Sequence, residues 1–182
     1  MVGIRATVCH CCSDMIAHKF GRRRFLVAGG ASLALAPIVG ADAAEGNYDA
    51  MLLTCIDPRF PEHSLSWMRR RDLSGKYSQF SIAGSAIGVV APAFADWQKA
   101  FWDNLGASMQ LHRIPRVIAV NHRDCGAAKI AYGAERVANA AVETDTHKAA
   151  LAEFRAAVAK RQPMLKVETA LMSLDGSVEI FT

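Results

Sequence analysis

Short apolar runs alternate with amphipathic segments along residues 44–182. The run at residues 50–54 is apolar up to its last residue, and in residues 116–120 four apolar residues follow Arg116. Runs of this length and composition are typical of strands buried in the centre of a sheet. Residues 79–83 alternate between polar and apolar side chains and end at Gly84, which predicts a further strand.

Two longer segments have helical periodicity. One extends from Asp96 to about His112 and repeats large apolar side chains at intervals of four, namely Trp97, Phe101, Leu105 and Met109. The other extends from Thr146 to about Arg161, with one side formed by Leu151, Phe154 and Val158. Strands that alternate with helices predict an α/β fold, a compact single domain with a mainly parallel central sheet flanked by helices.

The chain ends in a predicted hairpin. Residues 167–174 and 177–181 have the composition of strands, and the dipeptide Asp175-Gly176 lies between them. Asp-Gly between two apolar runs is a strong signal for a tight turn. We therefore expect the last strand to run antiparallel to the strand before it.

The first 43 residues have the composition of an export signal. The segment Gly21-Arg22-Arg23-Arg24-Phe25-Leu26 resembles the twin-arginine signal, and the apolar run from Phe25 to Val39 follows it. This run is shorter than the ~20 residues that span a bilayer, so we expect no permanent membrane span. Ala41-Asp42-Ala43 has the small-x-small pattern of a cleavage site. We predict a signal peptide over residues 1–43 and a mature periplasmic or secreted domain over 44–182, while a buried apolar helix is the alternative.

The extreme N-terminus leaves two questions open. Cys9-His10-Cys11-Cys12 contains ligand residue types, but it lacks the second, spaced pair that zinc-binding folds have. Met15 lies upstream of the arginines, and a start there would give a signal peptide of more usual length. Either Met1 or Met15 is compatible with the sequence.

The charge distribution disfavours a nucleic-acid partner. The chain has 21 Lys and Arg against 17 Asp and Glu, a net charge of +4. Residues 1–43 contribute five basic and two acidic residues, which leaves the rest of the chain close to neutral. Phosphate binding needs a basic face on the folded domain, and the predicted domain does not have the surplus for one.

Three polar side chains follow the first predicted strand directly. Cys55, Asp57 and Arg59 have the spacing i, i+2, i+4. In an extended chain this spacing points all three side chains to one side, so we expect them to share a pocket.

A second group follows the predicted strand at 116–120. His122 and Cys125 are three residues apart, which would place both on one face of a first helical turn. Ligands of open α/β sheets bind beyond the carboxyl ends of the strands, where Cys55 also lies. Two cysteines and a histidine suit Zn²⁺, with a fourth position for water or a carboxylate.

Together the two groups resemble the paired motif of the beta-class carbonic anhydrases. Cys55-Ile56-Asp57-Pro58-Arg59 with His122-Arg123-Asp124-Cys125-Gly126 is similar to that family's Cys-x-Asp-x-Arg and His-x-x-Cys-Gly. The resemblance covers about residues 48–182 and includes Ala83-Gly84.

This resemblance implies a zinc ion held by Cys55, His122 and Cys125, and reversible hydration of carbon dioxide to bicarbonate. Asp57, held by Arg59, would orient the attacking hydroxide. The resemblance also implies a homodimer or a higher homo-oligomer.

Some positions near the motif differ from the usual pattern of that family. Ser81-Ile82 stands where Arg-Asn is usual, and Asn121 stands where Gly is usual. Arg123 and Asp124 are charged where small residues are common. The resemblance assigns no role to these side chains.

Other interpretations of the same residues remain open. Cys55 and Cys125 are the only cysteines of the predicted mature chain, and in an oxidising compartment they could form a disulfide. Asp57 and Arg59 could be an ion pair that only stabilises a loop. The remaining histidines of the domain have no partner spacing and are expected to be packed or on the surface: His63, His112 and His147.

Three other functions are compatible with the sequence. An enzyme on the same scaffold could hydrolyse carbonyl sulfide or carbon disulfide, since both are neutral linear molecules with an electrophilic carbon. A non-catalytic zinc-binding module would use the same ligands. A redox dithiol protein is a third alternative, although its cysteines would be 70 residues apart rather than in Cys-x-x-Cys.

Overall fold

The computed structural model describes residues 46–182, which form a five-stranded sheet with helices on both faces. The elements, in chain order, are β1 (Ala50–Thr54), α1 (Pro61–Arg70), β2 (Tyr77–Ser81), α2 (Ala86–Val90), the short 3₁₀ helix η2 (Pro92–Phe94), α3 (Ala95–His112), β3 (Arg116–His122), α4 (Gly126–Tyr132), the 3₁₀ helix η3 (Ala134–Val137), α5 (Ala140–Arg161), β4 (Lys166–Met172) and β5 (Val178–Phe181). The strand order is β2-β1-β3-β4-β5. The first four strands are parallel, and β5 pairs antiparallel with β4. The predicted fold class and the terminal hairpin are therefore confirmed.

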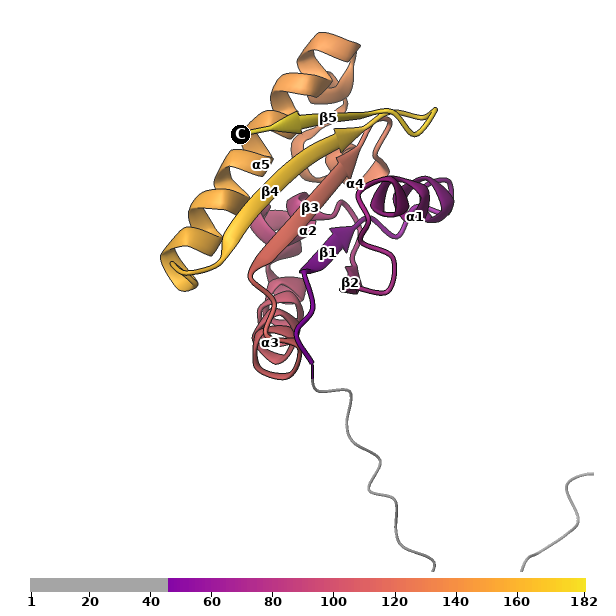
Figure 1. Cartoon of the computed structure of the whole chain (residues 1–182). Coiled ribbons are helices and arrows are strands. Elements are labelled where there is room, and N and C mark those ends of the chain that lie inside the picture. The colour runs from indigo at the N-terminus through magenta and orange to yellow at the C-terminus, as the bar shows by residue number, and fades with distance from the viewer. Residues whose placement is uncertain (1–45) are drawn as a thin grey trace, which may run out of the picture. The chain divides into compact units, whose positions relative to one another are not determined.

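Each face of the sheet has its own apolar core. Figure 1 shows α1 on one side of the sheet and α5 on the other. On the α5 side, Leu53 and Val117 pack with Phe101 of α3 and Phe154 of α5. On the α1 side, the buried set comprises Leu52, Ile118, Ala170 and Met172 of the strands with Trp67 and Met68 of α1. Alternate residues of the central strands thus enter opposite cores, as the period of a strand requires.

The parallel register brings the ends of β1 and β3 to one edge of the sheet. Leu52 lies opposite Ile118 and Leu53 lies opposite Ala119. Residues that directly follow β1 therefore reach the same edge as His122, the last residue of β3. This edge is where open α/β sheets bind ligands.

Several predicted boundaries differ from the structure, two of them by more than one residue at the start of the element. The strand predicted at 79–83 occupies Tyr77–Ser81, where it pairs in parallel with β1. The helix predicted from Thr146 begins at Ala140, because the Asn139 side chain accepts hydrogen bonds from the backbone N–H groups of the first turn.

One prediction about a side chain is also wrong. Trp97, expected in the apolar stripe of α3, is 43% exposed and stacks on Phe94 near the start of the helix, with ring centroids 4.5 Å apart. In the run Arg69-Arg70-Arg71 at the end of α1, the first two side chains are exposed. Arg71 is partly buried, where it forms an ion pair with Glu168 and lies over the Trp67 ring at 4.5 Å.

Within residues 46–182, no helix has both the length and the apolarity needed to cross a membrane. The predicted twin-arginine segment lies outside the described residues, and so do Cys9, Cys11 and Cys12.

Candidate metal centre

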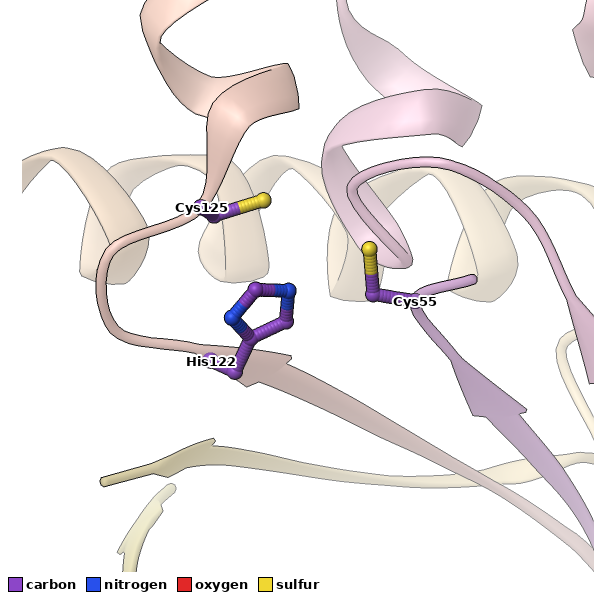
Figure 2. A group of neighbouring side chains, drawn as sticks. All are labelled: Cys55, His122 and Cys125. Carbon is purple, nitrogen blue, oxygen red and sulfur yellow. The ribbon is translucent and has the colours of Figure 1, made fainter. Parts of the chain in front are cut away.

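Three side chains converge at the carboxyl edge of the sheet. Cys55 directly follows β1, His122 is the last residue of β3, and Cys125 is the N-cap residue of α4. Their ligand atoms all lie within 4.8 Å of one another. Figure 2 shows the two sulfur atoms and the imidazole ring around one common space. The sequence motif and the fold therefore gather a group that could hold one metal ion.

The hydrogen bonds of His122 leave one ring nitrogen available to a metal. Nδ1 lies 2.8 Å from the carbonyl oxygen of Arg123, and because a carbonyl only accepts, Nδ1 carries the proton. Nε2 is buried and has no hydrogen-bond partner among the described residues. The Phe60 ring packs on the imidazole with centroids 4.1 Å apart. A buried nitrogen lone pair beside two sulfur atoms fits the ligand chemistry of zinc.

The two sulfur atoms have opposite pKa shifts. The hydrogen bond from the Cys125 thiol lowers the pKa of Cys55, against the opposing effect of burial, and His122 contributes in the same direction. The pKa of Cys125 is raised, first by its hydrogen bond to Cys55 and then by burial. Cys55 is therefore the more acidic of the two, and a bound cation would favour deprotonation of both sulfurs.

Gly84 contacts both cysteine segments. Its backbone N–H donates to the Cys55 sulfur at 3.2 Å. The φ of Gly84 is +80°, a backbone conformation that residues with a side chain rarely adopt. A Cβ at this position would lie 3.0 Å from the Cβ of Ala127, in the helix that Cys125 caps. The Ala83-Gly84 segment thus requires glycine for backbone conformation and for close approach.

The local routes that bring these residues together differ from those we predicted. His122 and Cys125 do not lie on one helical turn, since His122 ends a strand and Cys125 has extended backbone angles of −84° and 115°. Between them Asp124 has a φ of +55°, which reverses the chain direction. The segment after Cys55 is not uniformly extended either, because Pro58 and Arg59 form a turn.

Asp57 and Arg59 form a forked ion pair beside the ligand group. Arg59 Nε donates to Asp57 Oδ1 at 2.9 Å, and its terminal NH2 group donates to Oδ2 at 2.7 Å. These bonds, above all, lower the pKa of Asp57 to about 2. Asp57 Oδ2 lies 4.0 Å from His122 Nε2. An ionised carboxylate therefore faces the nitrogen that is free to bind a metal.

Sequence reasoning missed Glu143. This buried residue of α5 accepts a hydrogen bond from the Asp124 backbone N–H at 2.6 Å and pairs with the Arg123 guanidinium at 3.2 Å. The helix was predicted to begin only at Thr146, so Glu143 fell outside it. Asn139, an N-cap residue type four residues before Glu143, is the signal that could have placed Glu143 in the first turn.

A buried polar pair supports the end of β3. Asn121 accepts a hydrogen bond from the Ala86 backbone N–H and donates to His147 Nδ1, each at 3.1 Å. Burial lowers the pKa of His147 to about 4, so this imidazole is neutral at physiological pH. The asparagine where the resembled family has glycine thus connects β3 to α2 and α5.

Two pockets flank the ligand group. One, of about 560 Å³, borders Cys125, and its other lining residues include Arg123, Lys129, Asn139, Glu143, Leu174 and Asp175. The other, of about 230 Å³, borders Cys55 and is lined by Thr54, Ile56, Phe60, Pro61, Ser64, Gln79 and Ser81. Apart from Cys55 itself, the lining of this pocket has no acidic or basic side chain, which suits a small uncharged molecule.

No protein-family model matches the sequence. Two curated proteins do: an uncharacterized protein of Rickettsia conorii is 32% identical over 129 residues, which cover 71% of this chain and 69% of that protein. An uncharacterized protein of Rickettsia bellii is 31% identical over 129 residues, which cover 71% and 79%. The chain belongs to the family of these proteins. Neither name states an activity for this rickettsial family.

A solved structure extends the comparison to the fold. The Coccomyxa beta-carbonic anhydrase, determined in complex with acetazolamide, superposes with a TM-score of 0.50 at 16% identity. The match covers 75% of this chain and 72% of that one. The chain therefore has a beta-carbonic-anhydrase-like fold, with a Cys-His-Cys group that could bind a metal.

Proposed function

We propose that this protein catalyses the zinc-dependent, reversible hydration of carbon dioxide to bicarbonate. The observation that carries the proposal is the convergence of Cys55, His122 and Cys125, with their ligand atoms within 4.8 Å and Asp57 beside them. The beta-carbonic-anhydrase-like fold and the paired sequence motif support the same activity.

The donor set suits zinc. Two sulfur atoms and one neutral imidazole nitrogen would hold the ion through three protein ligands, which is the number that catalytic zinc sites use. Bound zinc would supply a Lewis acid that lowers the pKa of a water molecule towards ~7 and makes it a nucleophile near neutral pH.

Asp57 and Arg59 would orient the reacting groups. The Asp57 carboxylate is ionised at any pH well above about 2, so it can accept a hydrogen bond from the nucleophile but cannot donate one. Arg59 holds both carboxylate oxygens and sets the direction of the remaining lone pairs. A nucleophile held in this way keeps its own lone pair directed at the electrophilic carbon.

Two alternative functions would use the same residues. Carbonyl sulfide and carbon disulfide are also uncharged and linear, and the pocket at Cys55, which has no other acidic or basic side chain in its lining, suits them as well as carbon dioxide. A non-catalytic zinc-binding module would keep the three ligands but would not need Asp57 and Arg59. The forked ion pair beside the ligand group therefore favours an enzyme.

One set of measurements on the purified full chain separates these functions. Elemental mass spectrometry should find about one zinc ion per chain. Stopped-flow assays with a pH indicator should show a faster rate of carbon dioxide hydration for the wild type than for the His122→Ala variant. Hydrogen sulfide release from carbonyl sulfide tests the related hydrolase. Bound zinc with neither activity would identify a non-catalytic module, and a zinc-free wild-type protein would contradict the proposal.

We also propose that the protein is a homodimer or a higher homo-oligomer, as the resemblance to beta-class carbonic anhydrases implies. We further propose that it is exported by the twin-arginine route to the periplasm or secreted, as the resemblance of residues 21–26 to that signal implies. Light scattering tests the assembly. Export is tested by cell fractionation after joint replacement of Arg22, Arg23 and Arg24 by Lys, because the overlapping arginine pairs could substitute for one another.

A further inference from the structure

The two residues between His122 and Cys125 carry charges that the motif does not explain. Both are bound by Glu143 of α5. Glu143 Oε2 pairs with the Arg123 guanidinium at 3.2 Å, and Oε1 accepts the Asp124 backbone N–H at 2.6 Å. One buried carboxylate therefore holds the whole turn between the two ligands.

The backbone at Asp124 needs such support. Its φ of +55° lies in the left-handed region, which costs free energy for any residue other than glycine. The hydrogen bond to Glu143 is made by this residue's own N–H, so it acts on the strained unit directly. Arg123 neutralises the charge that Glu143 buries and also donates to Thr144 Oγ1 at 2.9 Å.

The Asp124 side chain extends the connection to the other ligand segment. Its Oδ2 accepts from Arg59 NH1 at 2.7 Å, and its backbone carbonyl accepts from Arg59 NH2 at 3.0 Å. The same guanidinium holds both oxygens of Asp57. Arg59 is thus bound at one end by its own loop and at the other end by the turn after β3.

We propose that Glu143 and Asp124 are positioning residues that fix the two ligand segments, and the Asp57 carboxylate, relative to each other. The contacts run from Glu143 to Asp124, then to Arg59, and from there to Asp57. The inference goes beyond the proposed function and rests on it only in that Asp57 would face a bound metal.

These contacts affect geometry more than stability. The side chains of Arg59 and Asp124 are 45% and 72% exposed, and exposed ion pairs contribute little to the free energy of unfolding. Asp124→Asn, which tolerates the left-handed backbone as Asp does, should therefore fold with a nearly unchanged thermal midpoint. Glu143→Gln keeps an oxygen that can accept the Asp124 N–H, and so it provides a mild variant of the buried position.

The first experiment measures zinc affinity of the full chain by competition with a chromophoric chelator. Glu143→Ala should weaken zinc binding by about 10-fold or more, the usual scale for residues that support metal ligands, and Glu143→Gln should recover part of it. The control is Glu153→Ala, an exposed glutamate in the same helix. Equal affinities for wild type and Glu143→Ala would overturn the role of Glu143.

The second experiment observes Arg59 directly by NMR of the full chain with ¹⁵N-labelled arginine. A guanidinium bound at both ends rotates slowly about its C–N bonds and gives separate terminal N–H signals. Asp124→Ala should speed this rotation by about 10-fold or more, the equivalent of one lost hydrogen bond. Asp124→Asn should lie between the two. Asp103→Ala, which removes the partner of the exposed Lys99, serves as the matched control and should change nothing.

The decisive outcome is the effect of Glu143 on Arg59 through Asp124. Glu143→Ala should also speed the rotation of Arg59, although Glu143 does not touch Arg59. Unchanged rotation in Asp124→Ala would overturn the inference, and a change in Asp124→Ala without one in Glu143→Ala would remove Glu143 from it. The NMR result is independent of carbon dioxide hydration and of zinc, so failure of the proposed function and failure of this inference are distinguishable.

Discussion

The two segments that carry the candidate ligands are held in different ways. The segment after β1 is stabilised mainly by its own residues, since Asp57 and Arg59 are two positions apart. It is also the more open segment, with Ile56 63% exposed. The turn after β3 is held from outside, by Glu143 of α5 and by the Phe60 ring against His122. A short motif can therefore specify the first segment, whereas the second depends on distant parts of the chain.

The largest expected effect is the loss of zinc when a candidate ligand of the segment after β3 is removed. His122→Ala and Cys125→Ser should each abolish stoichiometric zinc binding, since each variant leaves fewer protein ligands than the three that catalytic zinc sites use. Elemental analysis after dialysis measures the occupancy. Asp103→Ala, which removes an exposed carboxylate of α3 paired with Lys99, should keep one zinc per chain. Full occupancy in both ligand variants would remove the metal assignment.

A second prediction concerns the support of β3 by His147. Its folded pKa of about 4 lies below the ordinary 6.5, so the unfolded chain takes up a proton that the folded chain refuses. Stability is therefore complete above pH 6.5 and falls as the pH drops towards 4, by roughly 3 kcal/mol. In urea unfolding at a series of pH values, His147→Gln should lack this part of the pH dependence. A variant with the wild-type slope would show that His147 does not contribute to it.

A third prediction concerns the segment after β1. Asp57→Asn and Arg59→Ala should each lower turnover by about 10²-fold while zinc stays bound, because the first replaces the charged acceptor by a neutral amide and the second leaves the carboxylate without the guanidinium that orients it. Steady-state hydration rates, normalised to zinc content, give the comparison. If the variants lose stability but keep their activity per zinc-loaded molecule, then the ion pair has only a structural role.

The fold class could be predicted because its signals are local. The apolar run of β1 and the Asp175-Gly176 turn both lie where the periodicity placed them. The extent of α5 could not be predicted in the same way, since its start depends on a single capping side chain, Asn139. Periodicity alone does not predict that Trp97 is exposed. Its position lies in the first turn of α3, where a side chain on the apolar face can extend past the core.

The candidate site could be predicted in composition but not in geometry. The ligand types and the order of the two motifs identify Cys55, His122 and Cys125 as a group. The path between the last two could not be predicted, because it requires a left-handed residue at Asp124 where the sequence has no glycine. Glu143 supports that conformation through its hydrogen bond to the Asp124 backbone N–H. This is a tertiary contact, and the spacing of residues along the chain does not predict it.

The position of the ligands along the chain has a consequence for how the protein folds. Cys55 and Cys125 are 70 residues apart, and α1, β2, α2 and α3 all lie between them. A contact between residues so far apart in sequence forms late in folding, because closing the intervening loop costs chain entropy. A metal ion can therefore not act as a nucleus for this domain, as it does in a small zinc finger whose ligands are neighbours. A metal ion would meet the three candidate ligands together only when β1 and β3 are already paired, so metal binding should slow unfolding without accelerating folding.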